Sequence, residues 1–205
     1  AKGTSIEPYG ITRVVTADGR EIYRRKAVRG EVLVPPYVAA GITDLAVIRN
    51  LSSPPWPYTE DHAREFVGRE QAHKAPHFLV TLPEQKEVGV IGVTGLARRD
   101  DGIELGYWFA RDHWGRGYAT EAARAVVDLA RTLGHRRLNS AHYIDNPASG
   151  RVLAKIGFKP TGEIDQHHNA ARGVTVPVRR MAIDLASSDD GGFDGEPDMP
   201  RLRAA

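Results

Sequence analysis

Hydrophobic and polar positions alternate in several short runs of this chain, and between these runs the hydrophobic positions recur at helical spacing. Three of the alternating runs follow one another with only short turns between them, which predicts antiparallel neighbours. The pattern therefore predicts a mixed α/β domain. The expected strands cover residues 28–36, 77–82, 87–97, 103–110, 136–144, 158–164 and 174–185, and the expected helices cover residues 38–49, 60–72, 119–133 and 147–156.

The ends of three expected helices carry residues typical of helix caps. Thr59 precedes two acidic residues and is the expected N-cap of the second helix. Gly134 stands where a C-terminal glycine of the third helix belongs. Asn146 and Pro147 are the expected N-cap and first residue of the fourth helix, and Gly157 is its expected end. These residues set the helix limits more closely than the hydrophobic pattern alone.

Composition divides the chain into three parts. Its 205 residues are 41% hydrophobic and 26% charged, which fits one ordinary domain with an appended tail. We expect an N-terminal extension over residues 1–27 with a hairpin at Asp18-Gly19, a folded domain over 28–186, and an acidic disordered tail over 187–205. No apolar run reaches the length of a membrane span, and the N-terminus lacks the apolar stretch of a signal peptide, so a cytoplasmic protein without membrane contact is expected.

Charge and cysteine content argue against several classes of protein. The net charge of +2 is too small to indicate nucleic acid as a partner, and no strand interleaves aromatic and basic residues as an RNA-binding face would. The absence of cysteine excludes disulfides, thiolate metal sites and cysteine nucleophiles. His167 and His168 have no further ligand at metal-binding spacing, so we expect a loop there and no metal.

The segment RDHWGRGYATEAARAVVDLA, residues 111–130, joins a strand to a helix through a turn that contains Gly115 and Gly117. A helix start exposes unpaired backbone N–H groups and the positive end of the helix dipole, and glycine lets an anion approach closely. The segment is neither a Walker loop nor a complete dinucleotide-binding fingerprint. A phosphate site is one interpretation of this turn, and a tight bend without a ligand is the other.

Together with NPASGRVLAKIGF at residues 146–158, the stretch IELGYWFARDHWGRGYATEAARAVVDLA at residues 103–130 resembles the GNAT superfamily of acetyl-coenzyme A dependent N-acetyltransferases, in particular its RimJ/RimL-like branch. The resemblance covers most of residues 28–186. It implies an α/β (α+β) fold whose central mixed, mostly antiparallel sheet has about six to seven strands, is flanked by about four helices and splays at an acetyl-coenzyme A cleft. It also implies acetyl transfer to a primary amine by direct attack in a ternary complex, with acetyl-coenzyme A as cosubstrate and without a metal.

The resemblance further implies where the cofactor is held. The pyrophosphate would rest on backbone amides of the glycine turn, and the pantetheine arm would pair with the preceding strand and contact the following helix. Trp114 stands where the family has Gln or Arg, which removes one polar contact but no backbone contact. Arg116 either contacts phosphate or faces solvent. The implied cofactor-binding residues are Phe109, Arg111, Gly115, Arg116, Gly117, Tyr118, Ala119, Thr120, Asn146 and Ser149.

The catalytic groups are expected on the same two segments. The family often has a tyrosine acid where this chain has Leu153, so Ser149 becomes the candidate for stabilising or protonating the departing thiolate, with an ordinary surface serine as the alternative. Alternation places Glu104 on the strand face away from the apolar set, which makes it a candidate base or a salt-bridged surface residue. His113 and His142 are rival bases because the unperturbed pKa of histidine lies nearer neutrality.

The amine acceptor is less closely defined. Trp56 and Tyr58 would lie in a wall of the acceptor site or serve packing alone. Arg172, Arg179 and Arg180 near the other wall would form a basic rim that favours an acceptor with a carboxylate. The expected acceptor is a protein N-terminal amine, an amino acid or a small amine, and the protein is expected as a monomer or homodimer. A non-catalytic coenzyme A-binding sensor or interaction module of the same fold is the alternative.

Overall fold

The computed structural model describes residues 11–15, 21–25, 34–72, 76–82 and 90–185. The expected acidic tail over 187–205, the turn at Asp18-Gly19 and the first part of the strand expected over 28–36 lie outside these residues. In chain order the elements are β1 (Ile11–Val15), β2 (Glu21–Arg25), α1 (Val34–Ile42), α2 (Leu45–Ile48), α3 (Glu60–Ala72), β3 (His77–Thr81), β4 (Val90–Arg99), β5 (Gly102–Phe109), η1 (Arg111–His113), α4 (Tyr118–Thr132), β6 (Arg137–Tyr143), α5 (Pro147–Lys155), β7 (Lys159–Asn169) and β8 (Val174–Asp184).

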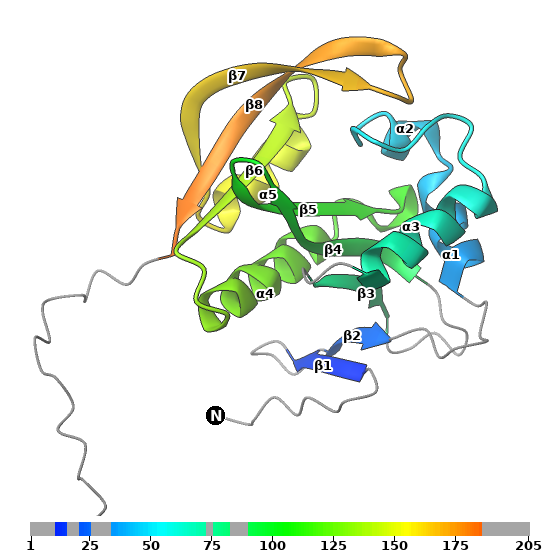
Figure 1. Cartoon of the computed structure of the whole chain (residues 1–205), viewed down its shortest axis with the longest axis horizontal. Coiled ribbons are helices and arrows are strands. Elements are labelled where there is room, and N and C mark those ends of the chain that lie inside the picture. The colour runs from blue at the N-terminus through cyan, green and yellow to red at the C-terminus, as the bar shows by residue number, and fades with distance from the viewer. Residues whose placement is uncertain (1–10, 16–20, 26–33, 73–75, 83–89, 186–205) are drawn as a thin grey trace, which may run out of the picture.

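Six strands form the central sheet in the order β3-β4-β5-β6-β8-β7 (Figure 1). Its neighbours are antiparallel except β5 and β6, which run parallel. In the described residues, β5 and β6 share one registered pair, Glu104 with Asn139, so the two strands diverge beyond it. The expected mixed, mostly antiparallel and splayed sheet is confirmed. A separate two-stranded sheet pairs β1 with β2 antiparallel, as the expected hairpin requires.

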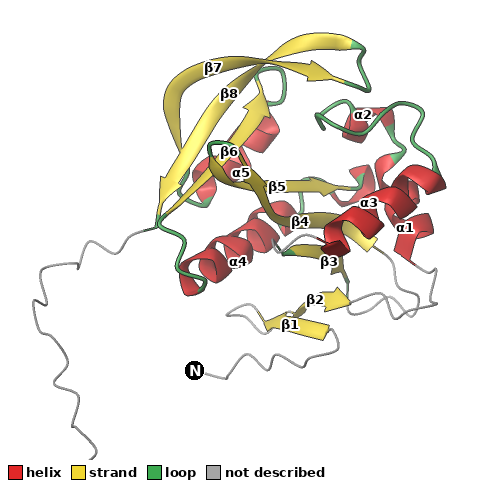
Figure 2. Ribbon diagram, viewed as in Figure 1, coloured by secondary structure: helices red, strands yellow, loops and turns green. Residues whose placement is uncertain are grey.

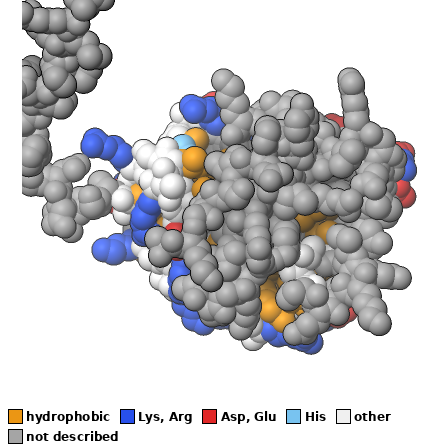
Figure 3. Space-filling model, turned by 90° about the horizontal axis from the view of Figure 1, so that it is seen from below, with side chains coloured by type: hydrophobic (Ala, Val, Ile, Leu, Met, Phe, Trp, Pro, Cys, Tyr) orange, Lys and Arg blue, Asp and Glu red, His pale blue; other side chains and the backbone are white. Residues whose placement is uncertain are grey.

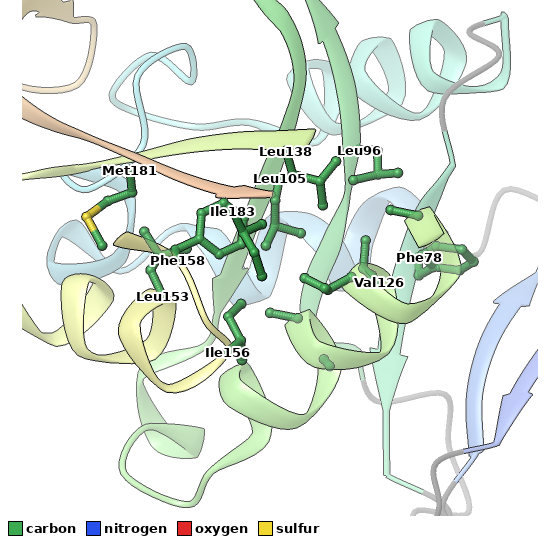
Figure 4. Packing of buried hydrophobic residues seen from close by; sticks show 14 of the residues in the cluster. Phe78, Leu96, Leu105, Val126, Leu138, Leu153, Ile156, Phe158, Met181 and Ile183 are labelled. Atoms are coloured by element: carbon green, nitrogen blue, oxygen red, sulfur yellow. The ribbon is translucent and has the colours of Figure 1, made fainter. Parts of the chain in front are cut away.

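Helices cover both faces of this sheet (Figure 2). On one face, Leu105 of β5 packs in a buried cluster with Val126 of α4 and Leu153 of α5. Figure 4 shows these side chains where the two helices face the sheet. On the other face, Trp108 of β5 packs with Val38 of α1 and with α2 and α3. None of the described helices is long and apolar enough to cross a membrane. Alternate side chains of β5 therefore serve opposite layers.

The predicted helix ends are confirmed. Thr59 accepts a hydrogen bond from a backbone N–H in the first turn of α3, which begins at the next residue. Asn146 caps α5 with its side-chain oxygen, and Pro147 is the first residue of that helix. Gly134 and Gly157 follow the last turns of α4 and α5 with positive φ angles of 79° and 100°. Short-range signals were sufficient here because each cap involves residues three or four positions apart.

The single helix expected over residues 38–49 is wrong, since the chain forms α1 and α2 there. Asp44 separates them: its Oδ1 accepts a hydrogen bond from the Ala46 N–H at 2.7 Å and starts α2 with a new N-cap. α1 begins at Val34, before the two prolines that were expected to end a strand, because proline in a first helical turn loses no intrahelical hydrogen bond. The described part of the chain thus has five α-helices rather than about four.

His167 and His168 lie on a strand rather than in the expected loop. β7 continues to Asn169, and the two histidines pair with Val176 and Thr175 of β8. Most side chains of β7 are exposed, so their hydrophobic pattern is too weak to mark the strand. Pairing with β8 therefore decided the length of this strand.

Asn169 joins segments that are distant in the sequence. Its fully buried Nδ2, which has two protons to donate, lies 3.0 and 2.9 Å from the carbonyl oxygens of Arg49 and Leu51 after α2 and 2.9 Å from the Tyr143 hydroxyl of β6. Its Oδ1 accepts a hydrogen bond from the Arg172 N–H at 2.8 Å. These contacts hold the tip of the β7–β8 hairpin beside α2 (Figure 1).

We expect Asn169→Ala to lower the free energy of unfolding by about 3 kcal/mol, because each buried group left without its partner costs about 1–3 kcal/mol. Urea denaturation followed by circular dichroism measures this change. Gln166→Ala, at an exposed position of the same strand, is the matched control and should change stability by less than about 0.5 kcal/mol. Equal losses in the two variants would show that Asn169 does not anchor the hairpin.

Candidate active site

The turn before α4 is built on two glycines with left-handed backbone. Gly115 has a φ of 73°, and Gly117, the N-cap of α4, has a φ of 88°, where any other residue would be strained. A Cβ placed on either glycine would meet no heavy atom within 4 Å, so backbone conformation rather than crowding requires glycine. No side chain caps α4 within the described residues. The first N–H groups of α4 are therefore open to an acceptor from outside the chain.

Trp114 fastens this turn to β5. Its Nε1 donates a hydrogen bond of 2.7 Å to the carbonyl oxygen of Phe109, the last residue of β5. Phe109 is buried, and its backbone is also in register with Gly92 of β4. The sequence indicates only the polar contact that Trp114 removes, and it gives no sign of this role, because the bond depends on how the turn folds back on the strand.

The other predicted residues of the turn differ in their surroundings. Arg111 lies in η1, and its guanidinium is 3.5 Å from the Asp44 carboxylate. Arg116 is exposed, which leaves it available to a ligand. In a view from below, the described part of the surface shows separate groups of Lys and Arg side chains (Figure 3). The first turn of α4 consists of the partly buried Tyr118, Ala119 and Thr120.

Tyr107 and Ser149 bring β5 and α5 together. The Tyr107 hydroxyl lies 2.9 Å from Ser149 Oγ and 3.1 Å from the Ser149 carbonyl oxygen. Burial raises the pKa of Tyr107 to about 12, although its hydrogen bond with Ser149 acts in the opposite direction. The phenol is therefore protonated at neutral pH. Alternation along the strand assigns Tyr107 to the apolar side and does not predict this contact; the hydroxyl group of Tyr107 is the only signal of it in the sequence.

Asn146 and Leu153 have structural contacts on α5. Asn146 Oδ1 accepts a hydrogen bond from the Ser149 N–H at 3.3 Å, which fixes the backbone of the serine. Leu153 is fully buried in the core between α5 and the sheet. The helix position at which the family often has a tyrosine is thus an apolar core position in this chain.

Glu104 lies on the face of β5 opposite to Tyr107. One carboxylate oxygen is 3.4 Å from Arg99 Nε, and the other is 3.7 Å from Arg180, so Glu104 is ion-paired. Its side chain is still 23% exposed. A Cβ placed on Gly106, the next residue on this face, would meet no heavy atom within 4 Å. The carboxylate of Glu104 therefore borders open space on the side of the sheet that α1 and α3 cover.

The two histidines proposed as rival bases differ in their hydrogen bonds. His142 Nδ1 lies 2.9 Å from the Tyr143 carbonyl oxygen, which can only accept, so Nδ1 carries the proton and Nε2 is the free nitrogen of the neutral ring. This ring packs against Gly150, where an added Cβ would lie 2.8 Å from Nε2. His113 Nδ1 is buried and has no hydrogen-bond partner among the described residues. His142 therefore keeps an available nitrogen near the start of α5.

The expected basic rim requires correction, because two of its arginines are already paired. Arg172 donates to both carboxylate oxygens of Asp145, at 2.7 and 3.1 Å, and these hydrogen bonds lower the pKa of Asp145. Arg180 pairs with the carboxylates of Asp101, Glu104 and Asp165. Both side chains are also mostly buried. Their charges are thus used within the protein rather than offered to an acceptor.

Trp56 and Tyr58 have different surroundings in the segment between α2 and α3. Tyr58 is buried among side chains of α1 and α3, and its ring centroid lies 5.5 Å from that of His62. Trp56 is 44% exposed. Tyr58 is therefore a packing residue, and Trp56 is the one of the pair that an acceptor can reach.

A family match brings these features together. Residues 34–159, more than half of the chain, match the family described as Acetyltransferase (GNAT) domain. The matched range contains the glycine turn, Tyr107 of β5 and Ser149 of α5. The chain belongs to the GNAT acetyltransferase family.

Curated relatives cover parts of the chain. "Uncharacterized N-acetyltransferase YoaA" of Bacillus subtilis is 36% identical over 81 residues, which are 39% of this chain and 46% of that protein. The ribosomal-protein-serine acetyltransferase of Escherichia coli is 28% identical over 123 residues, which are 58% of this chain and 68% of that protein. The chain spans about half to three fifths of the length of the first curated relatives it matches.

Solved structures share the fold over more of the chain. A GNAT-family acetyltransferase from Bacillus anthracis superposes with a TM-score of 0.68 at 21% identity, covering 85% of this chain and 99% of that one. The spermidine N-acetyltransferase of Vibrio cholerae, solved with coenzyme A and spermine, superposes with a TM-score of 0.62 at 18% identity, covering 78% and 94%. At these identities the likeness establishes the fold alone.

We expect the stability of the fold to fall as the pH rises from about 10 to about 12, because burial holds the pKa of Tyr107 above that of a tyrosine in an unfolded chain. In this window the unfolded chain releases a proton that the folded chain retains, so rising pH favours unfolding. Tyr107→Phe lacks this proton and should lose less stability over the same window. Urea denaturation at stepped pH values measures the difference, and parallel declines in the two proteins would contradict the assignment.

Proposed function

We propose that this protein is an N-acetyltransferase that moves the acetyl group of acetyl-coenzyme A to a primary amine by direct attack in a ternary complex. The observation that carries the proposal is the exposed turn of Gly115 and Gly117 at the uncapped start of α4, in the same segment that follows the diverging strand β5. Membership of the GNAT acetyltransferase family supports it. The coenzyme A in the solved Vibrio cholerae relative supports the choice of cofactor.

In this proposal, the turn binds one part of the cofactor and the edge of the diverging strand β5 binds another. The open N–H groups of residues 115–120 hold the pyrophosphate, and the exposed Arg116 adds charge there. The pantetheine amides pair with the β5 edge near Phe109 and Arg111, where β6 has moved away. The Phe109 carbonyl can still accept there, because it has two lone pairs and Trp114 uses one. Asn146 and Ser149 approach the same arm from α5.

The two substrates approach β5 from opposite faces in this proposal. Tyr107 and Ser149 lie on the α4–α5 side, whereas Glu104 and the open space over Gly106 lie on the α1–α3 side. A thioester held between the diverging strands is therefore accessible to an amine from the second side. This arrangement suits direct attack, because both reactants are positioned at once and no covalent acyl-enzyme is needed.

Ser149 and Glu104 have the proposed chemical roles. The Ser149 hydroxyl donates a hydrogen bond to the sulfur as the carbon–sulfur bond breaks, which stabilises the negative charge that develops there. Glu104 accepts the proton that the attacking amine loses, directly or through water across the open space at Gly106.

The acceptor that we propose is an α-amino group, as in the RimJ/RimL-like branch of the family. The similarity to the ribosomal-protein-serine acetyltransferase of Escherichia coli supports this choice. An α-amine with a pKa of about 7.7–8.0 is roughly one tenth neutral at pH 7, whereas a lysine-like amine is almost entirely charged. A modest base is therefore sufficient for an α-amine.

The buried Leu153 favours one second candidate, a coenzyme A-binding module without catalysis, because it removes the helix tyrosine. Incubation with acetyl-coenzyme A and a panel of peptides, amino acids and polyamines separates the two functions when free thiol is followed. Amine-dependent thiol release supports the enzyme, and coenzyme A binding without thiol release supports the module. Absence of binding would exclude both.

We expect Gly117→Glu to abolish coenzyme A binding, because it places a side chain and a negative charge where the phosphates are held. Isothermal titration calorimetry measures the affinity. Gly134→Glu is the matched control, since Gly134 follows the other end of α4, also has a positive φ and also borders open space. It carries the same strain and charge but should keep the parent affinity. Unchanged binding by Gly117→Glu would refute the phosphate site.

We expect Glu104→Gln to slow turnover of an α-amine acceptor about tenfold near pH 7 and much less near pH 9, because solvent then supplies the neutral amine. Coenzyme A affinity should not change. Arg99→Gln is the control, since it breaks an ion pair of Glu104 and keeps the carboxylate. A pH-rate profile distinguishes the roles, and activity equal to the parent from about pH 6 to 9 would remove Glu104 from the mechanism and favour His142.

A further inference from the structure

We infer that Tyr107 is a positioning residue that turns the Ser149 hydroxyl toward the leaving sulfur by donating its own hydrogen bond to Ser149 Oγ. The inference rests on the function proposed above, because it assigns a partner to the serine of that mechanism. It adds a residue that lies on β5, 42 positions before Ser149 in the sequence.

The number of protons in this contact allows two arrangements. The Tyr107 hydroxyl has one proton and two neighbours, Ser149 Oγ at 2.9 Å and the Ser149 carbonyl oxygen at 3.1 Å. The carbonyl can only accept. If Tyr107 donates to the carbonyl, the Ser149 hydroxyl must donate back to Tyr107 to make the shorter contact. If Tyr107 donates to Oγ, the Ser149 proton is free for another acceptor.

A developing thiolate favours the second arrangement. It offers negative charge to the Ser149 hydroxyl, which then donates its hydrogen bond to the sulfur instead of to Tyr107. The Tyr107 hydroxyl rotates about its C–O bond and donates to Ser149 Oγ instead of to the carbonyl oxygen. No heavy atom has to move, so the exchange requires little reorganisation. Donation from Tyr107 also polarises the serine hydroxyl and strengthens its bond to the sulfur, as in other chains of hydrogen bonds.

Burial and packing keep Tyr107 suited to this role. The ring packs against the core cluster between β5 and the helices α4 and α5, which limits its motion. The same burial keeps the phenol protonated at neutral and moderately alkaline pH. Ser149 is held from its other side, because its N–H donates to Asn146 Oδ1. The serine proton is thus the mobile part of a fixed pair of oxygen atoms.

Tyr107 keeps its proton throughout the reaction. The amine nitrogen forms a bond to the carbonyl carbon, the carbon–sulfur bond breaks, and the sulfur leaves with the electron pair. The amine proton passes to Glu104 or solvent, and the thiolate takes a proton from solvent after release. Tyr107 and Ser149 contribute hydrogen bonds alone.

The thiol pKa of bound coenzyme A tests the inference without knowledge of the acceptor. Titration of the protein–coenzyme A complex, followed by the ultraviolet absorbance of the thiolate, measures this pKa. Ser149→Ala should raise it, and Tyr107→Phe should raise it by a smaller amount. The double variant should match Ser149→Ala, because Tyr107 acts only through the serine. Tyr143→Phe, which removes a buried hydroxyl bonded to Asn169 instead, should leave the thiol pKa unchanged.

Turnover provides the second measurement. Loss of one neutral hydrogen bond predicts that Tyr107→Phe lowers kcat roughly two- to tenfold while the KM for acetyl-coenzyme A stays constant. The inference is overturned if Tyr107→Phe leaves the thiol pKa at the parent value, or if its effect adds to that of Ser149→Ala. Absence of coenzyme A binding by the parent protein would instead overturn the proposed function, so the two failures are distinguishable.

Discussion

The parallel pairing of β5 with β6 is the constraint on which the site depends. Strands joined through a helix can lie parallel, and α4 supplies that crossover here. The registered pairing involves Glu104 with Asn139, after which the two strands separate. Facing strand edges leave backbone N–H and C=O groups that need partners. A ligand that itself carries amides is the chemical complement of such edges, because its amides can form the hydrogen bonds that the separated strands no longer form with each other.

β5 lies between two helical layers, and its alternation separates two kinds of chemistry. Tyr107 points to the layer of α4 and α5, where it is partly buried and Ser149 completes its hydrogen bonding. Glu104 and Gly106 point to the layer of α1 and α3, where a carboxylate borders open space. A hydroxyl that is hydrogen-bonded to Ser149 and a carboxylate thus stand on opposite faces of one strand without meeting each other. Such separation prevents the two groups from pairing with each other within the protein.

Several side chains that look available in the sequence stabilise the walls of the site instead. Arg172 and Arg49 both contact the Asp145 carboxylate, which immediately precedes the N-cap of α5, and Asn169 binds the backbone after α2. These bonds tie the β7–β8 hairpin to the helix that carries Ser149. Trp114 has a similar effect on the turn before α4. The rigidity of the site therefore comes from contacts between elements, and two of the three arginines expected at an acceptor rim are paired within the protein instead.

The sequence pattern was sufficient to predict the features that depend on neighbours a few positions apart: the strand–turn–helix at Gly117, the cap at Asn146, and the antiparallel run from β3 to β5. It failed at Asp44, where a local cap outweighed a continuous helical pattern. Packing of the elements brings the Tyr107 hydroxyl to Ser149 and pairs Arg172 with Asp145, and neither contact follows from the sequence, because each joins different elements. The hydrophobic period encodes which face of a strand a residue occupies. It does not encode which polar atom of another element that residue contacts, since this depends on how the elements pack.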